Sequence, residues 1–302
     1  MTLKTVLQEK IINQWYLLAL VATVISAAVL VTMAGLDMST AEQVSAMIAY
    51  SVRWSVPWLY LAFAASSLQV LFSNDLTRWL LRNRKIMGLS FAVGMGWQVM
   101  FILWLVLGHT DYYVDEVYVL RDAIEGVVGY AFLIAMTVTS FKKTRSMMRP
   151  GHWKRLHKWG IYFLWAYAFS VYWHNLFYYP GPEWNYQPDW VDYVYYVGGL
   201  LAICARIAAW SKQELQKAAK QQRLAASGGG LLVLAVFLMV LGGVGTVAGT
   251  LWGLMAYEYL WDTMIFQPLE LYVPYWPFIP YLPLFLLLLG AAIRVRALRT
   301  AA

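Results

Sequence analysis

Residues 15–33 read WYLLALVATVISAAVLVTM, a run that contains no charged side chain. A helix needs roughly 20 consecutive apolar residues to cross a bilayer core of about 30 Å, and this run meets that length. It is too long and too poorly flanked for the apolar region of a signal peptide, and nothing resembling a cleavage site follows it. The run therefore predicts a retained transmembrane helix.

The rest of the chain repeats this pattern, since 61% of all residues are hydrophobic and only 13% are charged. Such a composition excludes an ordinary soluble domain. Hydropathy predicts an all-α integral membrane protein of about eight transmembrane helices. The expected spans are 14–36, 46–73, 87–108, 119–140, 157–178, 189–210, 229–251 and 276–293.

Basic residues are distributed as the positive-inside rule requires for this set of spans. All but two of the 23 lysines and arginines fall in alternate connections, the exceptions being Arg53 and Arg121. Because these connections face the cytoplasm, both termini are predicted to be cytoplasmic, in a multi-pass protein of the bacterial inner (cytoplasmic) membrane. The net charge of +7 is then explained by the orientation of the chain in the membrane and by attraction to membrane lipids, and it does not indicate nucleic-acid binding.

A change of composition divides the chain. Residues 211–230 read SKQELQKAAKQQRLAASGGG, which predicts a cytoplasmic linker with a helical first part and a flexible glycine-rich end. It separates a six-helix bundle, residues 1–210, from a two-helix C-terminal extension, residues 231–302.

Two outer connections, at 177–196 and 252–283, are rich in Trp and Tyr. Such residues are typical of the membrane–water interface, and the alternative is a docking surface for a periplasmic protein or another membrane subunit. Prolines recur at every third position from 274 to 283, which predicts an extended polyproline-like entry to the last helix. The candidate docking residues are Trp261, Tyr272, Tyr275 and Trp276.

Two further features concern helix packing. Gly245 and Gly249 have the spacing that lets two membrane helices approach closely, whether the second helix is internal or belongs to another protein. Arg53 and Glu125 are expected at similar depth in the second and fourth spans, where a structural ion pair is favoured over a proton path.

Three stretches resemble a known family. They are RNRKIMGLSF at 82–91, TVTSFKKTR at 137–145 and GHWKRLHKWGIY at 151–162. Together they are similar to the ferric-reductase-like transmembrane domain family, over about residues 45–210. That family includes the haem-bearing membrane subunit of a periplasmic methionine sulfoxide reductase system and, more distantly, the membrane domain of NADPH oxidases.

The resemblance implies haem-ligand positions at Gln98, His157 and Ser170, so only His157 keeps an imidazole. A b-type haem needs two axial ligands, and His109 and His174, at the outer ends of their helices, are the candidates for a relocated site. The alternatives are a chain without haem and a chain with a shifted haem. Gly94 and Gly96, beside Trp97, offer a third possibility, a pocket for a pigment, quinone or lipid.

Other catalytic chemistry has no support in the sequence, which contains no dinucleotide fingerprint, P-loop, zinc-type cysteine pair or His-Glu-x-x-His motif. We therefore expect no catalytic residues and no metal site of that kind. The leading hypothesis is a non-catalytic subunit or assembly scaffold of a larger redox or energy-transducing membrane complex. A b-type haem electron-transfer protein that serves a periplasmic acceptor is the alternative.

Overall fold

A computed structural model describes residues 3–180, 186–221, 229–261, 269, 272–276 and 278–298. Within these ranges every regular element is a helix, so the all-α prediction is confirmed. The long helices are α2 (Gln14–Ala34), α3 (Ala41–Leu71), α5 (Arg84–Gly108), α7 (Leu120–Val138), α9 (Pro150–Phe177), α10 (Trp190–Lys220), α11 (Gly229–Val247), α12 (Gly249–Trp261) and α14 (Leu282–Ala297). The short ones are α1 (Leu3–Val6), η1 (Lys10–Ile12), α4 (Asp75–Arg82), α6 (Thr110–Tyr112), η2 (Tyr113–Val117), α8 (Lys142–Ser146) and η3 (Ile279–Tyr281).

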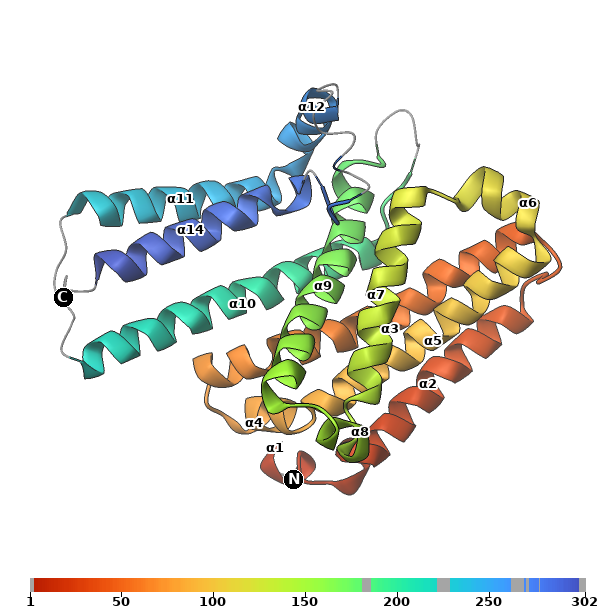
Figure 1. The fold of residues 1–302 in the computed structure, drawn as a ribbon, viewed down its shortest axis with the longest axis horizontal. Coiled ribbons are helices and arrows are strands. Elements are labelled where there is room, and N and C mark those ends of the chain that lie inside the picture. Colours follow the sequence, from red (N-terminus) through yellow and green to blue (C-terminus); the bar gives the residue numbers. More distant parts are fainter. Residues whose placement is uncertain are drawn as a thin grey trace. The chain divides into compact units, whose positions relative to one another are not determined.

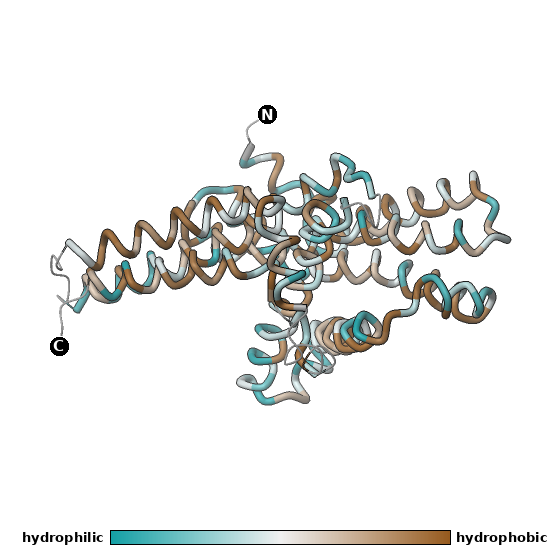
Figure 2. Tube along the Cα trace, turned by 90° about the horizontal axis from the view of Figure 1, so that it is seen from above, coloured by the Kyte–Doolittle hydropathy of each residue, from teal (hydrophilic) through white to brown (hydrophobic). Residues whose placement is uncertain are grey.

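Five segments of the described chain are long and apolar enough to cross a bilayer, and they indicate a multi-pass membrane protein. They are α2, α5, α10, α11 and the continuous η3–α14 segment at Ile279–Ala297. In Figure 2, hydrophobic residues recur along the lengths of the helices. The other three predicted spans fall on α3, α7 and α9, which are also helices.

The chain forms two compact units. Unit 1 comprises residues 1–65 and 74–168, and unit 2 comprises residues 66–73 and 169–302. Both α3 and α9 run without a break from one unit into the other, and α10 continues as a helix past residue 210 to Lys220.

Unit 1 is a helical bundle in which α2 packs along α5, and α5 also contacts α7 (Figure 1). In this unit α5 approaches α3 closely at Gly94. A Cβ atom on Gly94 would lie 2.5 Å from the Cβ of Ser55. Glycine is required there because any side chain would overlap the neighbouring helix.

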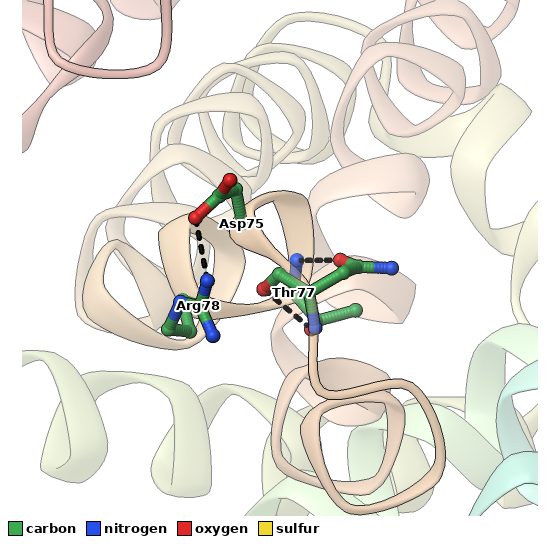
Figure 3. Close-up of polar contacts among 4 residues, drawn as sticks. Asp75, Thr77 and Arg78 are labelled. Carbon is green, nitrogen blue, oxygen red and sulfur yellow. Dashed lines mark hydrogen bonds and ion pairs between the residues drawn. The ribbon is translucent and has the colours of Figure 1, made fainter. Parts of the chain in front are cut away.

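The α4 helix begins with a reciprocal cap, shown in Figure 3. The Asn74 Oδ1 accepts from the Thr77 backbone N–H at 2.9 Å, and the Thr77 Oγ1 accepts from the Asn74 N–H at 3.3 Å. Asp75, in the first turn, accepts a hydrogen bond from Arg78 at 2.6 Å, which lowers the pKa of the Asp75 carboxyl from its usual value. The two hydrogen bonds of the cap satisfy backbone donors that have no partner within the helix.

The N-terminal segment is tied to α4 by a buried side chain. Asn83 is fully buried, and its Oδ1 accepts from the Gln14 backbone N–H at 2.8 Å. Its Nδ2 donates to Asn13 Oδ1 and to the Trp79 carbonyl, both at 3.1 Å. Gln14 has a φ of 51°, a left-handed conformation that costs energy for a residue other than glycine. The Asn83 hydrogen bond therefore helps to hold a strained start of α2.

Unit 2 contains a tight antiparallel helix pair, α11 and α14, which lie side by side in Figure 1. Each helix contributes a glycine at which the other approaches. A Cβ on Gly242 would lie 2.6 Å from the Pro283 carbonyl oxygen, and one on Gly290 would lie 2.7 Å from the Ala235 carbonyl oxygen. The backbones thus pack with almost no side chain between them.

The entry to α14 differs from the sequence prediction. Tyr275 and Phe278 have φ values of 63° and 65°, and Ile279–Tyr281 forms a 3-10 turn. A polyproline helix needs φ near −75° throughout, so the extended entry was wrong for the described residues. The prolines at 280 and 283 instead occupy the first turns of η3 and α14, where the missing N–H costs nothing.

Candidate functional site

Gln98, at the first position that the resemblance assigns to a haem ligand, takes part in a contact between helices of unit 1. The Tyr130 hydroxyl on α7 lies 2.7 Å from Gln98 Oε1 and 3.2 Å from the Met95 carbonyl oxygen on α5. One hydroxyl proton is therefore shared between two acceptors on α5. The contact ties α5 to α7 at the position that the resemblance assigns to a haem ligand.

His157, at the second assigned position, also forms a side-chain hydrogen bond. Its Nε2 lies 3.0 Å from Thr139 Oγ1, while the Thr139 hydroxyl donates to the Ala135 carbonyl at 2.6 Å. Because the Thr139 proton is used there, this network assigns the His157 proton to Nε2, which donates to Thr139. The Trp153 ring packs against the imidazole, with 4.4 Å between ring centroids.

Ser170, at the third assigned position, lies one helical turn before His174 in unit 2. The His174 Nδ1 lies 2.7 Å from the Ser170 carbonyl oxygen, so Nδ1 is the donor. The Nε2 atom then accepts from the Tyr257 hydroxyl on α12, at 2.6 Å. Aromatic rings surround the imidazole, from Trp173, Tyr178, Tyr179 and Tyr257.

The side chains at the three assigned positions cannot supply two imidazole ligands to a haem iron. Gln98 and Ser170 carry no imidazole, and the Nε2 of His157 points at Thr139. The fourth candidate, His109, is the half-buried C-terminal cap residue of α5 in unit 1. Among the described residues, neither His109 nor Gln98 forms a hydrogen bond or ring contact with another histidine.

The space predicted beside Gly94 and Gly96 is partly filled. Ser55 of α3 occupies the volume next to Gly94, whereas a Cβ on Gly96 would meet nothing within 4 Å. The Trp97 indole N–H donates to Ser26 Oγ at 3.0 Å, which joins α5 to α2. Around Gly94, neighbouring helices therefore take the place of a flat ligand.

Arg53 and Glu125 both belong to unit 1. Glu125 is buried on α7, with 9% of its surface exposed, and Arg53 is half-buried on α3. Burial of a carboxylate requires hydrogen bonds or a cation. The ion pair between these two residues stays a prediction.

Gly245 and Gly249 lie against helices of their own unit. A Cβ on Gly245 would lie 3.2 Å from the Pro283 side chain, and one on Gly249 would lie 2.6 Å from the Phe177 ring. The close approaches are therefore to α14 and α9.

The candidate docking residues differ in exposure. Tyr272 is 81% exposed, whereas Tyr275 and Trp276 are half-buried and pack on Tyr281 and Phe278. The side chain of Trp261 lies outside the described residues.

Sequence reasoning missed a buried carboxylate in the first aromatic connection. Asp192 is fully buried and accepts from Asn175 Nδ2 at 2.8 Å, from the Tyr186 hydroxyl at 2.9 Å and from the Asp189 N–H at 2.9 Å. Asp189 caps the α10 helix three residues before Asp192. That spacing at the start of an apolar run is the signal that could have revealed it.

No group of three or more potential metal ligands occurs among the described His, Cys, Asp and Glu residues. No protein-family model, curated protein or solved structure matches the chain. The ferric-reductase-like resemblance therefore stays a prediction.

Proposed function

We propose that the chain crosses the bacterial inner membrane eight times, with both termini in the cytoplasm. The three helices that supplement the five apolar ones are α3, α7 and α9, with 31, 19 and 28 residues. At 1.5 Å per residue the shortest of them, α7, is about 28 Å long, close to the thickness of about 30 Å of the hydrocarbon core, and its 19 residues lie within the range of about 17–25 found for membrane spans. Membrane helices packed among others tolerate polar residues such as Glu125 of α7.

In this membrane the chain acts as a non-catalytic subunit or assembly scaffold of a larger complex, built on a ferric-reductase-like bundle. The observation that carries this proposal is the contact between Gln98 and Tyr130. A side chain that the resemblance places at an iron ligand position instead joins α5 to α7. His157 forms a hydrogen bond with Thr139, and the Ser170 carbonyl accepts one from His174. All three positions therefore take part in hydrogen bonds within the protein.

Exposed apolar residues support a role in assembly. The α11 helix packs on α14 through its glycine side, while large residues on its other sides remain exposed, among them Val233, Val236, Phe237, Val240 and Val247. In a membrane such a surface meets lipid or a partner helix.

The test combines a spectrum with a size measurement on protein purified in mild detergent from native membranes. The pyridine haemochrome spectrum should contain no b-type band near stoichiometry, and native electrophoresis should show a species well above the mass of the chain. A stoichiometric haem band would overturn the non-redox assignment. A monomer in every mild detergent would overturn the scaffold.

A second candidate function, haem-dependent electron transfer, is favoured by one observation. His174 donates its Nδ1 proton to the Ser170 carbonyl, so the Nε2 lone pair points away from the backbone of its own helix. This arrangement is typical of metal-ligating histidines. Here that lone pair accepts from Tyr257. If this function holds, the haem absorption band disappears in His174→Ala and remains in Tyr257→Phe. A band that remains in both variants would contradict His174 as a haem ligand.

A further inference from the structure

A groove in unit 2 runs between α10, α11 and α14 and has a volume of about 630 Å³. This volume lies within the range of about 300–1,000 Å³ typical of small-molecule sites. One part of its lining is apolar, with Ile207, Leu215, Met239 and Leu287. The groove can therefore accommodate a hydrocarbon chain along that part.

The remaining lining is polar and basic. Lys212 of α10 and Arg294 of α14 both line the groove, together with Ser211 and Gln216, and its lining includes no Asp or Glu. A site with two cations and no carboxylate in its lining attracts an anion. Its ligand is therefore both acidic and apolar.

Lys212 is held in place by the end of another helix. Its Nζ donates to the Val70 carbonyl at 2.7 Å and to the Leu71 carbonyl at 3.3 Å. An ammonium group has three donors, so one remains for a ligand. Arg294 is exposed near the end of α14, and no described residue forms an ion pair with it.

We propose that this groove binds one anionic phospholipid, with the headgroup phosphate held by Lys212 and Arg294 and an acyl chain lying along Met239 and Leu287. Basic pockets at the cytoplasmic ends of membrane helices are suited to such headgroups. Free phosphate would leave the apolar lining without a function, and a neutral lipid would leave both cations unpaired. The proposal rests on the membrane topology proposed above, but it does not depend on the scaffold role, because the groove belongs to unit 2 and Gln98 to unit 1.

The test uses the full chain in nanodiscs or detergent micelles, with phosphatidylglycerol as the probe and phosphatidylcholine as the neutral comparison. Native mass spectrometry should show one retained phosphatidylglycerol. The double variant Lys212→Gln with Arg294→Gln should bind it roughly thirty-fold more weakly, which corresponds to about 1 kcal/mol for each basic residue. The matched control, Lys220→Gln with Arg296→Gln, removes the same charge from the same helices outside the groove and should bind as the wild type does.

Because Lys212 also caps a helix, a second variant leaves both cations in place. Ala208 lines the groove and is exposed, so Ala208→Trp fills the apolar part of the groove away from the contact between α11 and α14. This variant should abolish retention of phosphatidylglycerol while the protein stays folded. Equal weakening in the control pair, equal retention of phosphatidylcholine, or unchanged binding in Ala208→Trp would each overturn the proposal. Displacement by millimolar inorganic phosphate would identify a free-anion site instead.

Discussion

Gly242 and Gly243 are adjacent in α11 and differ sharply in their surroundings. A Cβ on Gly242 would lie 2.6 Å from the Pro283 carbonyl oxygen and 2.9 Å from the backbone nitrogen and Cγ of Leu287, whereas one on Gly243 would meet nothing within 4 Å. Replacing either glycine by alanine brings the same gain in helix propensity, up to about 1 kcal/mol. The difference between the two variants therefore isolates the steric cost at Gly242.

Insertion of a methyl group into a well-packed contact typically costs about 1–3 kcal/mol, and here backbone atoms of α14 cannot yield as a flexible side chain could. We expect Gly242→Ala to be less stable than Gly243→Ala by that amount. Reversible unfolding by dodecyl sulfate in mixed micelles, followed by tryptophan fluorescence, measures the difference. Equal stabilities would refute the packing of α11 on α14 through this glycine.

Three further variants test buried hydrogen bonds by the same unfolding assay. Asn83→Ala leaves the Gln14 backbone N–H without its acceptor and should lower the free energy of unfolding by about 1–3 kcal/mol, and an unchanged stability would refute the role of Asn83 as an anchor. Asp192→Ala removes the acceptor of three donors and should cost about 3–5 kcal/mol, and a neutral result would contradict its buried role. Tyr130→Phe removes the bond to Gln98 and should cost about 1 kcal/mol, whereas a gain in haem binding would overturn the structural assignment of that pair.

The helical architecture could be predicted from the sequence because a membrane span is a local property. A run such as residues 15–33 must satisfy its backbone hydrogen bonds internally, so hydropathy alone indicates a helix. The same reasoning failed at the entry to α14. Proline restricts only its own φ and the residue before it, so a proline every third residue is compatible with turns as well as with an extended helix.

Contacts between distant residues could not be predicted in this way. Gln14 and Asn83 are 69 positions apart, and His174 and Tyr257 are 83 positions apart, so no local pattern links them. Imidazole chemistry makes every histidine a possible metal ligand, but the hydrogen-bond partner of each nitrogen depends on which helices pack together. The spacing of Asp189 and Asp192 indicates a helix cap, but it does not show that the Asp192 carboxylate is buried against Asn175 and Tyr186.

The transmembrane topology is the most direct test of the account. In a Cys204→Ala background, single cysteines at positions 39, 73, 110 and 146 are treated in intact cells with a membrane-impermeant maleimide. The account predicts labelling of Ser39→Cys and Thr110→Cys in intact cells, and of Ser73→Cys and Ser146→Cys only after the membrane is permeabilised. Labelling of all four positions before permeabilisation, or a pattern that does not alternate, would contradict the eight-span arrangement.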